Sequence, residues 1–191
     1  MKYYVIEPKY FGKRGVYIIP NENVWKPRIC PKCGGNNVET SVPVKFSIKG
    51  TPCDIYENSG KLLISANCLE LFQQIGLTGY SILPAEVKVK NSNEEPDKLV
   101  YYELVINRKC GYAMDINGVY LPKCELCGRR FPLKEKVMGL SLNEADCDNN
   151  SIFAFDNLFN FPIVSATVKK EITKAKLSNF KFTEISQLEL L

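Results

Sequence analysis

Histidine is absent from the 191 residues of this sequence. Imidazole is the commonest general base and the usual activator of serine and cysteine nucleophiles, so its absence disfavours most acid–base and nucleophilic chemistry. A nucleophile elbow, a Walker loop and a dinucleotide-binding glycine pattern are also missing. No pair of acidic residues stands out at a spacing that indicates carboxylate catalysis. We therefore predict that the protein is not an enzyme.

Long apolar runs are absent too, and none approaches the ~20 residues that a membrane-spanning helix needs. The first residues, MKYYVIEPKYFGKR, lack the apolar segment of a signal peptide. Neither sign of charge is in large excess, because 25 basic and 21 acidic residues leave a net charge of +4. That excess is too small to indicate nucleic acid as a partner by itself. We expect a cytoplasmic protein with reduced cysteines and no membrane partner.

The sequence does contain a pair of cysteine motifs, CPKCG at residues 30–34 and CELCG at residues 124–128. A tetrahedral zinc site takes four soft ligands, and each Cys-x-x-Cys turn supplies two thiolates from a rigid local geometry. Four protein thiolates leave no open position for water or substrate, which disfavours a catalytic zinc. We therefore predict a structural Zn²⁺ ion with four ligands: Cys30, Cys33, Cys124 and Cys127.

Each motif ends in a glycine, Gly34 or Gly128, where the chain must curl back and direct amide N–H groups at the sulfurs. We expect a left-handed backbone at both glycines, which a side chain would disfavour. Four thiolates around Zn²⁺ carry a formal charge of about −2, and nearby cations favour the thiolate form. The cations expected to offset this charge are Arg28, Lys32, Lys123, Arg129 and Arg130. The 90 residues between Cys33 and Cys124 mean that the metal would link two distant parts of the chain.

Other interpretations of the two motifs are a redox pair, unligated thiols, or disulfides in a secreted protein. Eight cysteines in 191 residues fall below the density of a disulfide scaffold. Cys53, Cys68, Cys110 and Cys147 show no paired spacing that would define a second site. Cys68 falls on the apolar face of a predicted helix and fits a buried core thiol. Cys110 fits either a spare ligand or a turn residue.

A repeat of 100 residues organises much of the remaining sequence, because residues 62–82 align with residues 162–182. Each copy predicts a short strand, a helix and a second strand. Ser65 and Ser165 are the expected N-caps. Gly79 and Asn179 take equivalent turn positions and belong to residue types that tolerate a left-handed backbone. The predicted buried faces of the helices comprise Cys68, Leu71, Phe72 and Ile75 in the first copy, and Val168, Ile172 and Ala175 in the second.

Strand-like patterns dominate elsewhere, at residues 3–6, 16–19, 42–48, 87–89 and 99–106. Pro43 predicts that the strand at 42–48 lies at a sheet edge. The segment DINGV at residues 115–119 predicts a hairpin turn before the second cysteine motif. The sum is an α+β protein with a largely antiparallel sheet, two helix–strand units and a zinc clasp between distant loops. We expect one domain over residues 1–191, which divides, if at all, into 1–90 and 98–191 at the polar linker 91–97.

The two CxxCG motifs, with Trp25 and Pro27 shortly before the first, resemble the double-CxxCG-motif family of bacterial immunity-type proteins. The segment ISANCLELFQQIGLTGYSILP is similar to segments of related immunity families from polymorphic toxin systems. The resemblance implies a small cytoplasmic protein that binds a cognate protein toxin and protects the cell that makes it. It implies binding without catalysis, on a fold held by zinc. Acidic loops such as residues 143–150 could steer a basic toxin.

A second hypothesis is a zinc-ribbon-like nucleic-acid-binding protein that contacts phosphates through RRF at residues 129–131. A third is a scaffold protein whose sheet edges recruit partners. The small net charge argues against nucleic acid. The basic stretches at residues 129–136 and 169–176 are interrupted by acids, which is typical of solvated faces.

Overall fold

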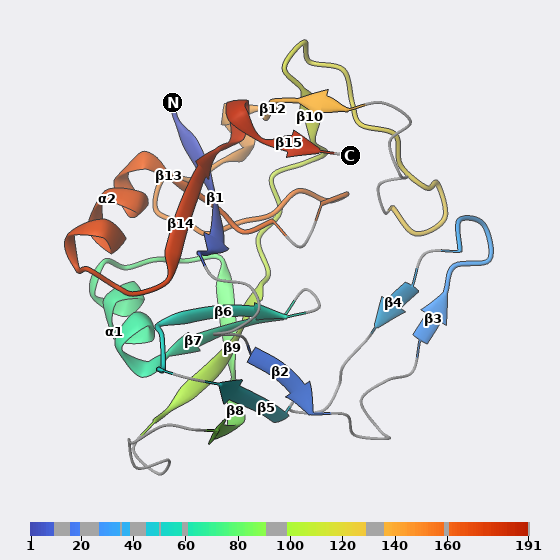
Figure 1. Cartoon of the computed structure of the whole chain (residues 1–191). Coiled ribbons are helices and arrows are strands. Elements are labelled where there is room, and N and C mark those ends of the chain that lie inside the picture. The colour runs from blue at the N-terminus through green and yellow to red at the C-terminus, as the bar shows by residue number, and fades with distance from the viewer. Residues whose placement is uncertain are drawn as a thin grey trace.

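A computed structural model describes residues 1–9, 16–19, 27–34, 36–38, 45–49, 51–58, 61–90, 99–128, 136–158 and 161–190. Within these ranges the protein has an α+β fold, as predicted, with two short α-helices and mostly antiparallel strands (Figure 1). The helices are α1 (Ala66–Gln74) and α2 (Ala166–Lys174), and the short 3-10 helices are η2 (Glu144–Asp146) and η3 (Ile185–Gln187). The strands are β1 (Tyr3–Pro8), β2 (Val16–Ile19), β3 (Pro27–Ile29), β4 (Asn36–Val38), β5 (Lys45–Lys49), β6 (Ile55–Asn58), β7 (Lys61–Ser65), β8 (Tyr80–Lys90), β9 (Tyr101–Ile106), β10 (Met114–Asp115), β11 (Val137–Met138), β12 (Leu140–Ser141), β13 (Ile163–Ser165), β14 (Phe180–Glu184) and β15 (Glu189–Leu190).

The larger sheet has six strands in the order β2-β5-β8-β9-β7-β6. All neighbours are antiparallel except β5 and β8. The edge strands β2 and β6 also contact each other, so the sheet curls around a small core that includes Phe46 and Tyr56. The prediction of an edge strand at 42–48 is wrong for its described part, because β5 has neighbours on both sides. Pro43 lies outside the described residues.

A second sheet among the described residues has three strands in the order β13-β1-β14, with β1 antiparallel to both neighbours, and three further sheets have two strands each. Strands from the beginning of the chain therefore pair with strands from its end. The expected linker at 91–97 lies outside the described residues, and the strands that flank it, β8 and β9, pair with each other. The sheets thus do not divide at this segment.

The predicted repeat is present in the structure at an offset of 100 residues, since α1 and α2 have matching bounds. Ser65 and Ser165 have nearly identical N-cap backbones, with ψ of 163° and 166°. Each serine Oγ accepts a hydrogen bond from the backbone N–H three residues later, which satisfies one of the free donors at the helix start. The turns after the helices also match, with a positive φ of 87° at Gly79 and 69° at Asn179.

The duplication extends to a third strand in each copy, which the sequence comparison did not predict. Strand β9 lies between β7 and β8, and β1 lies between β13 and β14 in the same manner. The registers agree, because Ser65 pairs with Tyr101 as Ser165 pairs with Tyr3. We call β7-α1-β8-β9 the first unit and β13-α2-β14-β1 the second unit. In the first unit the third strand follows the helix along the chain, whereas in the second it precedes it.

Two loop segments lock the units together by reciprocal hydrogen bonds. Asp54 accepts from the Ser65 Oγ at the N-cap of α1 and from the Ser178 N–H in the turn after α2, at 2.7 Å each. The segment around Asn150 makes the opposite connection, from the start of α2 to the end of α1. The Asn149 carbonyl accepts from Ser165 Oγ, at the N-cap of α2, at 2.6 Å. Asn150 Nδ2 donates to the Gly76 carbonyl at 2.8 Å, in the turn after α1. Each segment therefore joins the start of one helix to the end of the other.

Both helices contribute to one shared hydrophobic core, which also contains Ile6, Ile55, Leu104 and Ile152. Cys68, Phe72, Val168 and Ile172 are buried as predicted, and Leu71 and Ile75 are partly buried at its margin. Ala175 is exposed, contrary to the prediction, because it is the C-cap residue at which α2 ends. Burial of a large apolar side chain contributes about 1.5–3 kcal/mol. The core therefore holds the two units together as one packed body.

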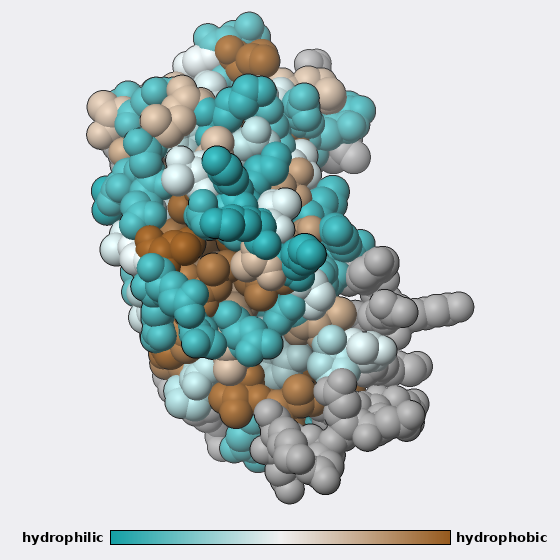
Figure 2. All heavy atoms as spheres, turned by 90° about the vertical axis from the view of Figure 1, so that its left-hand side faces the viewer, coloured by the Kyte–Doolittle hydropathy of each residue, from teal (hydrophilic) through white to brown (hydrophobic). Residues whose placement is uncertain are grey.

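Figure 2 shows the side of the molecule where both helices lie, with apolar patches between otherwise hydrophilic surfaces. No helix in the described ranges is long and apolar enough to cross a membrane.

Candidate metal centre

The first cysteine motif forms the tip of a two-stranded hairpin. Strands β3 and β4 pair antiparallel from Pro27 opposite Val38 to Ile29 opposite Asn36. The chain turns between them through residues 31–33, and the Gly34 N–H donates to the Cys30 carbonyl at 2.8 Å. Gly34 has φ of 67°, a left-handed value that glycine adopts without the penalty of a side chain.

The second cysteine motif follows a hairpin that is anchored in the protein interior. Leu121 is buried, and its N–H donates to the Ala113 carbonyl at 2.9 Å. Ala113 is in turn held by the Asn157 Oδ1, which accepts from its N–H at 2.9 Å. The predicted DINGV turn is present, since the Asp115 N–H donates to the Val119 carbonyl at 2.8 Å. This anchoring fixes the direction in which the chain enters the second motif.

The turn of the second motif repeats that of the first. The Gly128 N–H donates to the Cys124 carbonyl at 2.8 Å, and Gly128 has φ of 71°. The prediction of a left-handed backbone at both glycines is therefore confirmed. Because the two motifs have the same local geometry, each offers its pair of thiols in the same arrangement.

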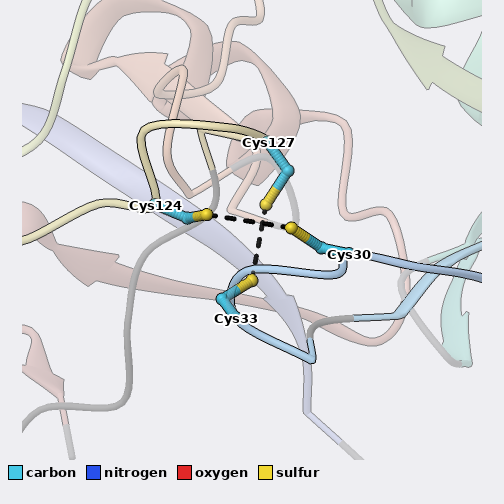
Figure 3. Close-up of side chains that lie close together, drawn as sticks. All are labelled: Cys30, Cys33, Cys124 and Cys127. Atoms are coloured by element: carbon cyan, nitrogen blue, oxygen red, sulfur yellow. Dashed lines mark hydrogen bonds between the residues drawn. The ribbon is translucent and has the colours of Figure 1, made fainter.

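The structure brings the four predicted ligands together, with all four Sγ atoms within 4.8 Å of one another (Figure 3). Across the two motifs, the Cys30 and Cys124 Sγ atoms lie 3.8 Å apart, and the Cys33 and Cys127 Sγ atoms lie 3.6 Å apart. A tetrahedron with metal–sulfur bonds of about 2.3 Å has sulfur–sulfur edges of roughly 3.8 Å. The four cysteines are thus positioned to hold a metal ion.

Two ligands face the interior and two lie nearer the surface. Cys124 is fully buried and Cys30 nearly so, whereas Cys33 and Cys127 are half-buried. The backbone N–H groups of Cys33 and Lys32 lower the pKa of Cys30 to about 6, against the opposing effect of burial. The N–H groups of Cys127 and Leu126 lower the pKa of Cys124 in the same way. The turns therefore favour the thiolate, which is the form that binds metal.

The charged side chains around the motifs are arranged differently from the prediction. Lys32 forms an ion pair with Glu125 of the other motif, so its charge is shared with a carboxylate. Lys123 lies over the Tyr112 ring, with Nζ 3.2 Å from the ring centroid. The side chain of Arg28 and all of Arg129 and Arg130 lie outside the described residues. Backbone N–H donors thus contribute to thiolate stability at Cys30 and Cys124, as expected from turns that direct amide N–H groups at the sulfurs.

The other four cysteines lie apart from this cluster. Among the described residues, no further group of cysteine, aspartate or glutamate side chains is placed to hold a metal. Cys68 is fully buried under α1, as predicted, and burial raises the pKa of its thiol far above the ordinary value. Cys53 and Cys110 are also buried, and their Sγ atoms lie 3.6 Å from the Thr51 and Ala154 carbonyls. Cys147 is half-buried with Sγ 3.5 Å from the Asn143 carbonyl.

A closed set of four thiolates can organise structure, but it leaves no coordination position for a substrate. Cys30 and Cys124 are 94 residues apart in the sequence, so an ion at this place would join two distant parts of the chain. No protein-family model and no curated protein matches the chain. The likeness to the double-CxxCG-motif family therefore remains a prediction from the motifs.

Proposed function

We propose that the cysteine cluster holds a structural zinc ion. The observation that carries this proposal is the closed arrangement of four Sγ atoms, from two turns of the same geometry, at edges close to those of a zinc–thiolate tetrahedron. Zinc favours four thiolates in structural sites and undergoes no redox change in them. Its role here would be to fasten the β3–β4 hairpin to the segment that follows Leu121.

Elemental analysis of protein purified without added metal tests this assignment. We expect zinc in a one-to-one ratio with the chain, retained in Cys147→Ser, a thiol outside the cluster that serves as the matched control. The Cys30→Ser and Cys124→Ser variants should lose the ion, because each lacks one of four ligands. Full zinc content in both ligand variants, or another metal in the wild-type protein, would refute the assignment.

We propose further that the protein is a non-catalytic immunity protein of the bacterial cytoplasm, which binds and neutralises a cognate toxin. The two CxxCG motifs and the segment from residue 64 to 84 support it through their resemblance to immunity families. A metal site without an open position and the absence of histidine favour binding over catalysis. A standard interface of about 800 Å² per partner is a small part of the 10944 Å² surface.

Coexpression with a candidate toxin tests the immunity function. A toxin domain, where one is encoded beside this gene, would be induced in cells that carry the wild-type protein, Cys124→Ser or Cys147→Ser. We expect survival with the wild-type protein and with Cys147→Ser, and the two proteins should copurify in near-equal amounts. Killing in the presence of well-folded wild-type protein would reject the function for that toxin. Loss of protection in Cys124→Ser alone would connect it to the metal centre.

A second candidate function is nucleic-acid binding, favoured by the placement of the first motif at the tip of an antiparallel hairpin, as in zinc ribbons. The residues proposed to contact phosphates, 129–131, lie outside the described part of the chain. This function predicts binding to DNA or RNA that weakens steeply as salt is raised. Nuclease-sensitive copurification of nucleic acid with the wild-type protein would move it ahead of immunity.

A further inference from the structure

The two helices occupy equivalent positions in their units but carry opposite charge. Residues 65–79, which span α1 and its turn, contain one glutamate and no basic residue, a net charge of −1. Residues 165–179, which span α2 and its turn, contain four lysines and one glutamate, a net charge of +3. Because the backbones match, the fold itself does not call for this difference.

Three of the four lysines are exposed and have no ion-pair partner among the described residues: Lys170, Lys174 and Lys176. Lysines elsewhere in the second unit differ from these, since Lys2 pairs with Glu184 at 3.0 Å and Lys181 pairs with Glu7 at 2.9 Å. Figure 2 shows hydrophilic side chains around this helix. The exposed face of α2 therefore presents positive charge that the protein does not neutralise.

The positions of these lysines are unfavourable for the helix itself. Lys169 lies in the first turn of α2, near the positive end of the helix dipole, and Lys170 is the central residue of the helix. Lys170 and Lys174 are four residues apart, so their like charges face each other. Lys176 has φ of 56°, a left-handed backbone that the first unit gives to Gly76. The dipole favours Lys174 at the helix end, but it does not explain the others.

The fourth lysine continues the cationic surface onto the adjacent sheet. The Lys169 Nζ lies 3.7 Å from the centroid of the Tyr4 ring and 5.9 Å from that of Phe182. Lys169 thus lies over two half-buried aromatic rings, on the face of the sheet that also carries Ile6 of the shared core. Proteins that bind single-stranded nucleic acid offer open aromatic faces on which bases stack. This surface instead offers ammonium groups on a short helix, an arrangement suited to carboxylates.

We propose that the exposed face of α2 and the turn after it, with Lys170, Lys174 and Lys176 and with Lys169 beside them, is a docking surface for an acidic patch of a partner protein. The inference rests on the proposed function and names the chemistry of the toxin surface that the immunity protein would meet. Complementary charge of this kind raises the association rate and selects the orientation of the partner. The acidic loops considered from the sequence for a basic toxin would then play no part at this interface.

Fluorescence anisotropy with a labelled oligo-glutamate peptide at low ionic strength tests the docking surface directly. The test variant is Lys170→Glu with Lys174→Glu. The control for net charge is Lys45→Glu with Lys88→Glu on β5 and β8, where Lys45 is paired with Glu86 in the wild-type protein. We expect peptide affinity to fall about tenfold in the α2 variant and by less than about twofold in the control. Zinc content and the unfolding midpoint of each variant, measured alongside, confirm that both remain folded.

Equal loss of affinity in the two variants would overturn the proposal, because net charge alone would then explain binding. Undetectable binding of the peptide by the wild-type protein would also overturn it. Tighter binding of a single-stranded oligothymidine of equal charge, lost in the α2 variant, would reassign the surface to nucleic acid. Failure of toxin protection with an intact difference in peptide binding would reject the immunity function alone, so the two failures are distinguishable.

Discussion

The two helix–strand units share a backbone but solve the same turn with different side chains. In the first unit the Ile152 carbonyl approaches the turn so closely that a Cβ on Gly79 would lie 2.3 Å from its oxygen. In the second unit the equivalent residue, Asn179, has a side chain whose Nδ2 donates to the Ile55 carbonyl at 2.7 Å. The first turn has room for a nearby carbonyl because Gly79 has no side chain. The second turn binds a carbonyl through the amide donor of the Asn179 side chain.

This difference shows which properties a duplicated unit must keep. Both turns need a left-handed residue, and glycine and asparagine are the residue types that adopt this backbone most readily. Both helices need a serine N-cap and a buried apolar stripe. The exposed charge is not constrained in this way, so α2 differs from α1 where the packing leaves it free to do so.

The largest effect is expected from removing the metal centre, which lies outside both helix–strand units. Cys124→Ser should abolish metal binding, since three remaining thiolates form an incomplete site. We expect hydrogen exchange to show lost protection in β3 and β4 and retained protection in β1, β7, β9 and β13. Cys147→Ser is the control and should match the wild type. Lost protection throughout both units would show that the metal centre supports the whole fold.

A glycine substitution tests the turn of the first unit. Gly79→Ala places a Cβ 2.3 Å from the Ile152 oxygen in a left-handed backbone, and should destabilise the protein by about 3 kcal/mol. Gly118→Ala is the control, because its φ is 81° but no atom lies within 4 Å of the added Cβ. It should cost about 1 kcal/mol from the backbone alone. Equal losses in urea denaturation would show that the close carbonyl does not matter.

The reciprocal hydrogen bonds between the units can be compared in the same way. Asp54→Ala removes the acceptor shared by Ser65 and Ser178 and should destabilise the protein by about 2–3 kcal/mol. Asn150→Ala removes one exposed amide that caps the end of α1, and should cost about 1 kcal/mol. Urea denaturation of both variants would measure the two values, and a larger loss for Asn150→Ala would reverse the ranking proposed here.

The smallest change in stability is expected at Lys176, the residue of the second unit that is equivalent to Gly76 of the first. Lys176→Gly removes a side chain from a left-handed backbone and should stabilise the protein by about 1 kcal/mol. The converse change, Gly76→Lys, should destabilise it by a similar amount. Thermal unfolding of the two variants should show a higher melting temperature for Lys176→Gly and a lower one for Gly76→Lys. A loss of stability in Lys176→Gly would mean that the lysine makes a favourable contact in the folded state.

Local chemistry explains what the sequence could predict. Ser65, Ser165, Gly79 and Asn179 act through backbone geometry within a few residues, and the repeat at a spacing of 100 residues aligned them correctly. The four metal ligands were predictable because each turn brings its own pair of cysteines together. The distances between the two motifs were not, since they depend on contacts over 94 residues.

Apart from the exposure of Ala175 at the end of α2, the features missed by sequence reasoning depend on long-range pairing. The equivalence of β1 and β9 could not be seen in the sequence repeat, because β9 follows the helix of its unit along the chain whereas β1 precedes the helix of its unit. The role of Asp54 could not be inferred, because its partner Ser178 is 124 residues away and no local pattern marks the contact. The interior place of β5 depends on parallel pairing with β8, which a single proline upstream does not reveal.

The central position of β1 has a consequence for biosynthesis. Its neighbours β13 and β14 lie 160 and 180 residues later in the chain, counted from Tyr4 to its partners Val164 and Glu184. At ribosomal rates of roughly 5–20 residues per second, β1 waits on the order of 10 s before either partner exists. During that time both of its edges are open to other strands. The first unit, whose strands are close together in the chain, can form well before the second, which closes only when α2 and β14 have been made.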